Sequence, residues 1–292
     1  MSSGIVIPSA GGQLMEWSAP IDYSSVVFNG AGLFPNIGDK YLDASARKNN
    51  GTLVNGPVWE YSPELGQWGM RSVKGAPAKH IDLTGTDTST FAFIRNTMVF
   101  TISSWVKFDD PTNERNVIMG SSNTYSLKGF FYSLETVSYS GNVLLAAPRF
   151  WITYGSSTHG YDTYGSNNAI TDTNWHHLLT CGRGLKNIEY WVDGVQLTSA
   201  VANDEGSNPG GADDYKSLLL NRNADAGGSD TINMSGVLAS HMVLRQPVSL
   251  PQIQWLADPT NNPWQPWKRR LWSIAAVAVG TQIDLPLIQV VI

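Results

Sequence analysis

The stretch WHHLLTCGRGLKNIEYWVDGVQL, residues 175–197, carries the clearest structural signal in this chain. Apolar and polar residues alternate in two runs, 174–179 and 188–197, which predicts two β-strands joined by the polar turn 182–187. The second run contains Asp193-Gly194, a dipeptide that tolerates the positive φ angles of a tight hairpin. Residues 100–108 form a third segment of the same kind. Together, the three segments predict antiparallel β-structure.

The composition is typical of a folded protein rich in β-strands. Of the 292 residues, 42% are hydrophobic and only 15% are charged, which argues against a disordered chain. The 28 Gly and 15 Pro are spread along the sequence, as expected for many short strands and frequent turns. The net charge of −5 gives no general attraction to nucleic acid, and the basic cluster 268–270 is too short to change this.

Neither a membrane-spanning helix nor a disulfide is expected. No stretch is long and apolar enough to cross a membrane, and the N-terminus lacks the basic start and apolar run of a signal peptide. We therefore expect a soluble protein that is not exported by classical secretion. The single cysteine, Cys181, follows Trp175 in a predicted strand, so it is expected to be a buried small hydrophobe rather than a catalytic thiol.

Short strands are predicted along most of the chain, separated by polar loops. The loops include 155–173 and 202–215, and residues 249–256 form a short helix with a Ser cap and a Pro in the first turn. The remaining strands are expected at 25–28, twice within 69–83, twice within 91–108, and at 116–120, 129–134, 142–146, 150–154, 217–221 and 236–244. About a dozen strands and one helix predict an all-β, antiparallel two-sheet sandwich of jelly-roll topology.

The segments 100–108, 174–197 and 236–256 resemble the laminin-G-like branch of the concanavalin A-like lectin/glucanase domains. A loop of that family runs Asp-x-Ser-Gly-x-Gly-Asn-x-Gly before Thr-Leu. Here Ala46 and Lys48 replace its two middle glycines, whereas the other positions match: Asp43, Ser45, Asn49 and Gly51. The resemblance implies a β-sandwich binding module at 22–259, preceded by an N-terminal arm at 1–21 and followed by a C-terminal β-rich extension at 260–292.

The same resemblance raises a calcium site, because many such domains hold Ca²⁺ through loop carboxylates, Asn side chains and backbone oxygens. Asp43 and Asn49 are the candidate ligands here. The family often has an acidic residue in its last core strand, where this chain has Ala239-Ser240. We favour the alternative in which Asp43 accepts hydrogen bonds from the amides of its own turn and no cofactor is needed.

Catalytic motifs are missing from the sequence. Glycosidases with this fold place two carboxylates on alternate residues of one strand, in a Glu-x-Asp-x-x-Glu string or a close variant. No such string occurs, and Glu189 and Asp193 make a poor pair because Asp193 belongs to the hairpin turn. The neighbours His176 and His177 point to opposite faces of a strand, so they cannot easily bind one ion. The sequence therefore predicts a protein that is not an enzyme.

A glycan site is predicted within residues 150–168. Sugars bind through CH faces stacked on aromatic rings, with nearby amides and hydroxyls as hydrogen-bond partners. The segment supplies aromatic rings among Gly, Ser, Thr and Asn, and the candidates are Trp151, Tyr154, His159, Tyr161 and Tyr164. The alternative is that these rings pack over the edge of the sandwich.

The C-terminal extension suggests assembly. An exposed segment this apolar would aggregate, so its own domain or another subunit must cover it. The candidate contact residues are Trp264, Trp267, Leu271, Trp272, Ile283, Leu285, Leu287 and Val290. Residues 259–272 are similar to tails that follow such domains in phage-encoded proteins. We expect a virion surface or decoration component whose partners are other virion proteins, capsid or tail proteins, further copies of itself and cell-surface glycans. The alternatives are a free carbohydrate-binding lectin and a divergent glycoside hydrolase or lyase.

Overall fold

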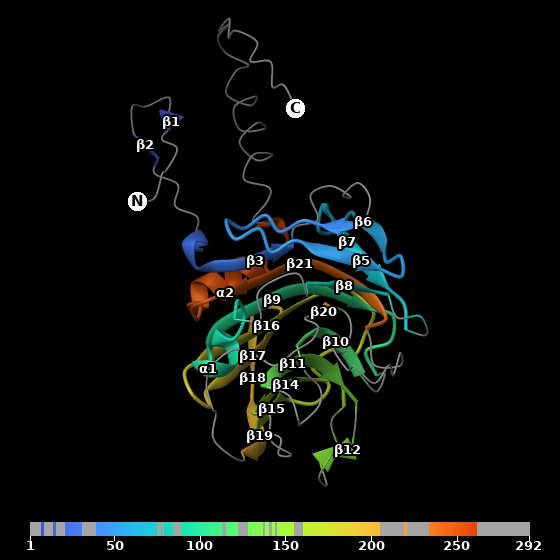
Figure 1. Cartoon of the computed structure of the whole chain (residues 1–292), viewed down its shortest axis with the longest axis vertical. Helices are drawn as coiled ribbons and strands as arrows, with labels where there is room; N and C mark the ends of the chain where they lie inside the picture. Colours follow the sequence, from blue (N-terminus) through green and yellow to red (C-terminus); the bar gives the residue numbers. More distant parts are fainter. Residues whose placement is uncertain are drawn as a thin grey trace, which may run out of the picture.

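A computed structural model describes residues 7–8, 14–15, 21–30, 39–74, 77, 79–83, 89–112, 115–121, 128–136, 138–139, 142–143, 145–154, 160–204, 219–220 and 234–261. Two large antiparallel sheets pack face to face with the main core between them. We call the sheet that contains β21 (Gly236–Leu244), in the upper part of Figure 1, the upper layer, and the sheet that contains β15 (Tyr161–Gly165), in its lower part, the lower layer. The predicted two-sheet sandwich is therefore confirmed. None of the described helices is long and apolar enough to cross a membrane.

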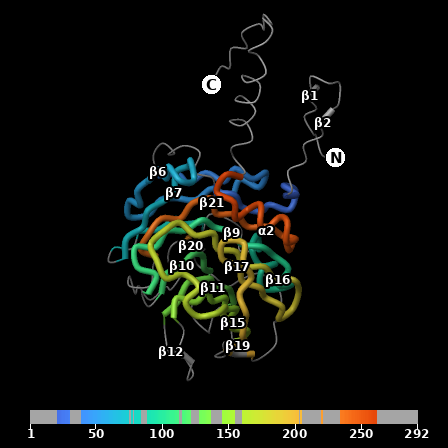
Figure 2. Tube along the Cα trace, turned by 180° about the vertical axis from the view of Figure 1, so that it is seen from behind, coloured from blue at the N-terminus to red at the C-terminus, as the bar shows by residue number. Residues whose placement is uncertain are grey.

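The upper layer is an eight-stranded sheet. Its strands, in spatial order, are β18 (Val195–Leu197), β17 (Ile188–Val192), β16 (His176–Arg183), β9 (Val99–Phe108), β21 (Gly236–Leu244), β7 (Gln67–Ser72) and β6 (Val58–Ser62), and β3 (Val26–Gly30) also pairs with β21. Seen from behind, β6 and β7 lie at one end of this layer and the helix α2 (Leu250–Ala257) at the other (Figure 2).

The lower layer is a nine-stranded sheet. Its strands, in spatial order, are β19 (Ser199–Asp204), β15 (Tyr161–Gly165), β14 (Ala147–Tyr154), β11 (Lys128–Glu135), β10 (Arg115–Gly120), β20 (Leu219–Leu220), β8 (His80–Asp82), β5 (Gly51–Val54) and β4 (Lys40–Tyr41). Two small hairpins pair β1 (Ile7–Pro8) with β2 (Leu14–Met15) and β12 (Ser138–Tyr139) with β13 (Asn142–Val143). The short helices are η1 (Tyr23–Ser25), α1 (Phe93–Asn96) and η2 (Pro259–Asn261).

The segment 174–197 forms the strands and the hairpin that its sequence predicts. β16 pairs with β17 and, on its other side, with β9. β17 turns into β18 at Asp193 and Gly194, whose φ angles are +50° and +77°. The positive φ angles are those that a tight hairpin requires, and an Asp-Gly pair adopts them at low cost.

Apolar residues fill the space between the sheets and also cover part of the outer face of the eight-stranded sheet. Phe100 and Ile102 of β9 belong to the main core, together with Phe150 from the opposite sheet. A second cluster forms where Ile253 and Leu256 of α2 pack on the outer face. Its strand residues are Val26, Leu179, Cys181, Trp191, Met242 and Leu244. Cys181 is fully buried, as the sequence predicts.

The helix predicted at 249–256 is confirmed as α2. The side chain of Gln252 accepts a hydrogen bond from the Ser249 backbone amide at 2.7 Å, and Ser249 caps the first turn in return. Such a reciprocal capping box satisfies two backbone amides that the helix itself leaves without partners.

Three sequence-based assignments were wrong. The first strand expected within 91–108 is the four-residue helix α1, whose turn is closed by hydrogen bonds from the amides of Asn96 and Thr97 to the carbonyl oxygens four residues before them. The expected loop 155–173 contains the strand β15, and the expected loop 202–215 begins within the strand β19. The sequence of β15 looks polar because it contains Asp162. This residue is buried, and its charge is paired with Arg149 of the neighbouring strand β14.

Replacing Gly236 by Ala is expected to destabilise the protein more than the same change at Gly184. Both glycines have φ angles that L residues rarely adopt, +147° and +137°, and such strain costs about 1–3 kcal/mol. A Cβ at Gly236 would also lie 2.1 Å from the Lys107 carbonyl oxygen, whereas a Cβ at Gly184 meets nothing within 4 Å. Denaturant titration should show a further loss of about 1–3 kcal/mol for Gly236→Ala. Equal losses in the two variants would contradict the steric explanation.

Candidate binding site

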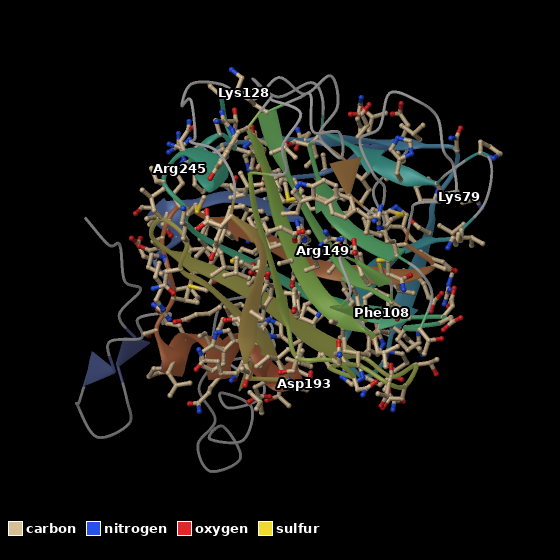
Figure 3. All side chains as sticks on the ribbon, turned by 90° about the horizontal axis from the view of Figure 1, so that it is seen from below. Lys79, Phe108, Lys128, Arg149, Asp193 and Arg245 are labelled. Atoms are coloured by element: carbon tan, nitrogen blue, oxygen red, sulfur yellow. The ribbon has the colours of Figure 1, made fainter. Side chains whose placement is uncertain are left out.

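The outer face of the nine-stranded sheet carries most of the buried charge of the described chain. In the strand register, Arg149 lies opposite Ser133 and Tyr164, and Trp151 lies opposite Asp162. Directly opposed residues of antiparallel strands share a face, so these five side chains lie on one side of the sheet. The other side carries core residues. Figure 3 looks onto this outer face from below, with Arg149 near its centre.

Arg149 joins two carboxylates from neighbouring strands into one ion network. Its Nη1 donates to Glu135 Oε2 at 2.7 Å and its Nε donates to Asp162 Oδ1 at 2.9 Å, while Nη2 contacts the second oxygen of Asp162. On its other side, Glu135 faces Arg115 Nε at 3.2 Å. Arg149 is 1% exposed, and Glu135 and Asp162 are fully buried. We call these four residues the Arg149 network.

The Arg149 network holds its charges in a fixed, balanced arrangement. Burial alone would lower the pKa of Arg149, but the hydrogen bonds and charges of Asp162 and Glu135 raise it above its ordinary value. Arg149 therefore remains a cation, and both carboxylates face it. Breaking such a buried pair leaves an uncompensated charge, so the network is a rigid structural element of this face.

Of the five residues predicted to bind a glycan, the four that the structure describes lie on two different faces of the sheet. Trp151 is 3% exposed and packs with Val117 and Phe131 on the outer face. Tyr154 and Tyr161 point the other way, into the core between the sheets.

Strand alternation separates these rings, because successive side chains of a strand point to opposite faces. The Tyr161 hydroxyl donates to the Lys186 carbonyl oxygen at 2.7 Å, and burial raises the pKa of Tyr161 to about 12. Tyr164 is half-buried on the outer face, and His159 lies outside the described residues. A glycan-stacking role for Tyr164 and His159 stays a prediction.

Asp43, one of the two candidate calcium ligands, is occupied by hydrogen bonds. Its Oδ1 accepts from the amides of Asn29 and Ser45, each at 2.8 Å. Its Oδ2 accepts from the Ser45 hydroxyl and the Asn49 amide, each at 2.7 Å. The Asn49 side chain donates to the Val27 carbonyl oxygen at 2.8 Å. Asp43 thus accepts hydrogen bonds from amides of its own loop, as we favoured from the sequence. The loop also contacts β3 through the amide of Asn29 and the carbonyl oxygen of Val27.

Metal ligands do not cluster elsewhere in the described part of the chain. No group of three or more His, Cys, Asp or Glu side chains there could hold a metal ion.

His177 lies inside the eight-stranded sheet and is not part of a catalytic triad. Its Nε2 lies 2.8 Å from the Ser103 hydroxyl, and its ring packs against that of Trp105 with 5.4 Å between centroids. Burial lowers the pKa of His177 to about 4, so the ring is neutral at physiological pH. Its Nδ1 has no hydrogen-bond partner among the described residues, whereas a triad places a carboxylate there. This histidine therefore has a packing role.

His176 forms a clasp between two exposed carboxylates. Its Nδ1 lies 2.7 Å from Asp193 Oδ2, and its Nε2 lies 3.0 Å from Asp172 Oδ1. The second oxygen of Asp193 accepts from the His177 amide at 2.8 Å, which ties the hairpin turn to β16. The pKa of His176 is raised, chiefly by the hydrogen bond to Asp193. We call these three side chains the histidine clasp.

Comparison with known proteins agrees with this architecture. A family model described as the concanavalin A-like lectin/glucanases superfamily matches residues 82–254, more than half of the chain. The chain belongs to this superfamily. Among curated proteins, none matches it.

Several solved structures share the fold. The binding domain of botulinum neurotoxin serotype C1 superposes with a TM-score of 0.56 at 12% identity, covering 81% of this chain and 52% of that one. The binding domain of Paraclostridial Mosquitocidal Protein 1 gives 0.54 at 15% identity, covering 82% and 53%. Domain 4 of AbnA, an extracellular GH43 arabinanase from Geobacillus stearothermophilus, solved with arabinotriose, gives 0.51 at 16% identity, covering 80% and 98%. At these identities the likeness shows the fold alone, and this chain spans about half the length of the toxin domains.

The Arg149 network was not predicted from the sequence. Glu135, Arg149 and Asp162 are far apart in the sequence and form no motif. The one local signal was a charged residue placed within or beside a strongly apolar run, since Arg149 precedes Phe150, Trp151 and Ile152. A buried charge in such a run requires a partner, but only the strand register identifies it.

The stability that the histidine clasp contributes is expected to fall as the pH rises. Because the folded-state pKa of His176 is raised above 6.5, the folded protein binds this proton more tightly than the unfolded chain. The contribution is complete below pH 6.5 and is lost as the pH rises through the folded pKa. Urea titrations should show the difference in unfolding free energy between wild type and His176→Asn shrinking as the pH rises above 6.5 and through the raised pKa of His176.

His177 does not interfere with this measurement. Its folded pKa of about 4 confines its own effect on stability to pH values below 6.5. A difference between the wild type and His176→Asn that does not change with pH would contradict the clasp.

Proposed function

We propose that this chain is a non-enzymatic, lectin-like binding component of a virion surface, acting through protein–protein and glycan contacts. The observation that carries the non-enzymatic part is the Arg149 network. A glycosidase needs one carboxyl group that is protonated and another that is ionised. Here Glu135 and Asp162 are both fully buried, and both accept hydrogen bonds from the guanidinium of Arg149. Two carboxylates that are buried and bound to one guanidinium do not face a glycosidic oxygen of a bound glycan.

The fold supports a role in binding. Among the structures of similar fold are a neurotoxin binding domain in complex with rat synaptotagmin II and another in complex with SialylT. The arabinanase domain was solved with arabinotriose. These ligands and receptors are bound by the toxin and arabinanase domains. They support our proposal that this chain, which has the same fold, also binds a glycan or a receptor.

The virion assignment is supported by the C-terminal extension. Its apolar sequence needs cover by its own domain or by another subunit. The resemblance of residues 259–272 to tails of phage-encoded proteins stays a sequence-based expectation. The predicted assembly residues lie outside the described residues, so their contacts stay a prediction: Trp264, Trp267, Leu271, Trp272, Ile283, Leu285, Leu287 and Val290.

Binding without turnover is the expected behaviour of the full-length protein. It should be retained on at least one immobilised oligosaccharide or polysaccharide, measured on a glycan array, while releasing no reducing ends from that glycan. The contrary result is release of reducing ends by the wild type that is lost in a folded Glu135→Gln or Asp162→Asn variant. That outcome would establish a divergent hydrolase.

A chain that ends at Arg270 tests the assembly role. We expect the full-length protein to sediment as an oligomer or with virus particles, and the shortened protein to lose this association. Thermal unfolding of both proteins shows whether the sandwich is intact. An unchanged oligomeric state and particle association would show that residues 271–292 are not the assembly segment, and monomers in both cases would favour a free lectin.

A further inference from the structure

The hairpin of β6 and β7 presents an exposed aromatic pair that the sequence analysis did not single out. Tyr61 is 46% exposed, and Trp68, directly opposite it in the register, is half-buried. Their ring centroids are 5.4 Å apart and their planes meet at 61°, so the two rings form a corner. The neighbouring pair on the same face, Trp59 and Met70, packs into the core. Tyr61 and Trp68 therefore lie one step beyond the core, at the end of the upper layer (Figures 1 and 2).

The turn next to this corner is held rigidly. The Ser62 hydroxyl accepts from the Leu65 amide at 3.1 Å and donates to Glu64 Oε2 at 2.9 Å. Leu65 is buried against Trp105 and Ala239 on the outer face of the sheet. A ligand that binds to an already fixed surface loses less free energy to ordering than one that binds a mobile loop.

The stem of the hairpin is held as well. Arg71 of β7 pairs with Glu60 of β6 and with Asp109 beyond the end of β9. Ser240 of β21 donates to Gln67 Oε1 at 2.6 Å. The two strands that carry the aromatic rings are thus fixed to the body of the sandwich on both sides of the turn.

We propose that the corner formed by Tyr61 and Trp68 binds a neutral sugar ring of a glycan. This assignment rests on the proposed binding function and gives it a location. When two rings meet at a steep angle, one ring can stack on a face of a sugar while the other contacts the edge of the sugar. The CH groups of the sugar make the apolar contact with the rings. The Tyr61 hydroxyl makes no hydrogen bond within the described part of the chain, so it is available to a sugar hydroxyl.

The carboxylate of Glu64 beside the corner disfavours an acidic ligand, with Lys107 as the nearby cation that interacts with it. Glu64 is exposed at the turn, and the Ser62 hydroxyl contacts one of its two oxygens. The other oxygen can accept from a sugar hydroxyl. Its own backbone amide and the Ser62 hydroxyl lower the pKa of Glu64, so the carboxylate is ionised at neutral pH. Like-charge repulsion then disfavours sialic or uronic acids at this position.

The test uses the full-length protein, an array of neutral and acidic oligosaccharides, and calorimetry with the best neutral ligand. Tyr61→Ala should weaken that binding about tenfold or more, because it removes the stacking surface. Tyr61→Phe keeps the ring and should retain most of the affinity. Glu64→Gln should improve the binding of acidic sugars relative to neutral ones, because it removes the repelling charge.

Tyr23→Ala is the matched control, because Tyr23 is a tyrosine of similar exposure, 40%, in η1. It should leave affinity unchanged, and both alanine variants should unfold at the temperature of the wild type. Neutral-glycan binding that survives Tyr61→Ala, or is instead lost in Tyr164→Ala, would overturn this location and leave the proposed function standing. A preference for acidic sugars would overturn the ligand class. If the wild type binds no glycan at all, the glycan part of the proposed function fails, and this inference fails with it.

Discussion

The structure depends on β9, the strand that pairs with β16 on one side and β21 on the other and is buried on both faces. A strand in this position cannot leave a hydroxyl group without a partner. Ser103 bonds His177 Nε2, Ser104 bonds His241 Nδ1, each at 2.8 Å, and Thr101 donates to a backbone carbonyl oxygen at 2.8 Å. Burial keeps both imidazoles neutral by lowering their pKa values to about 4 and about 3. A slip of one residue would separate every such pair and turn the core residues outward, so these polar contacts fix the register along with the apolar ones.

The same requirement governs the opposite sheet. There the buried polar groups are charged, and the Arg149 network pairs Glu135 and Asp162 with Arg149 on the outer face. Exposed aromatic surface is instead found at the end of the other sheet, on the hairpin of β6 and β7. The structure thus places its paired charges in buried positions and an exposed aromatic pair at the edge of a sheet.

Two aromatic segments show that closeness in the sequence does not place rings on one surface. Trp151, Tyr154 and Tyr161 were grouped because they are close in the sequence and surrounded by polar residues. Once their segments are strands, alternation sends Tyr154 and Tyr161 into the core and Trp151 to the opposite face. Tyr61 and Trp68 are seven residues apart and were not grouped, yet the hairpin places them directly opposite each other. Exposed aromatic pairs arise from register across strands, which proximity along the chain does not reveal.

The sequence by itself determined the class of the fold. The alternation in 174–197, the Asp193-Gly194 turn and the capping residues of α2 are local features, and each produced the element that it predicts. It also indicated that Asp43 binds its own turn, because an Asp-x-Ser loop satisfies its amides locally. The tertiary structure alone decided which strands are neighbours. Arg149 has its partners on neighbouring strands, His177 is buried against residues of β9, and Tyr61 faces Trp68 across a hairpin. Each of these contacts links residues on different strands. Those contacts depend on sheet order and register, which are set by the packing of the whole core rather than by any one segment.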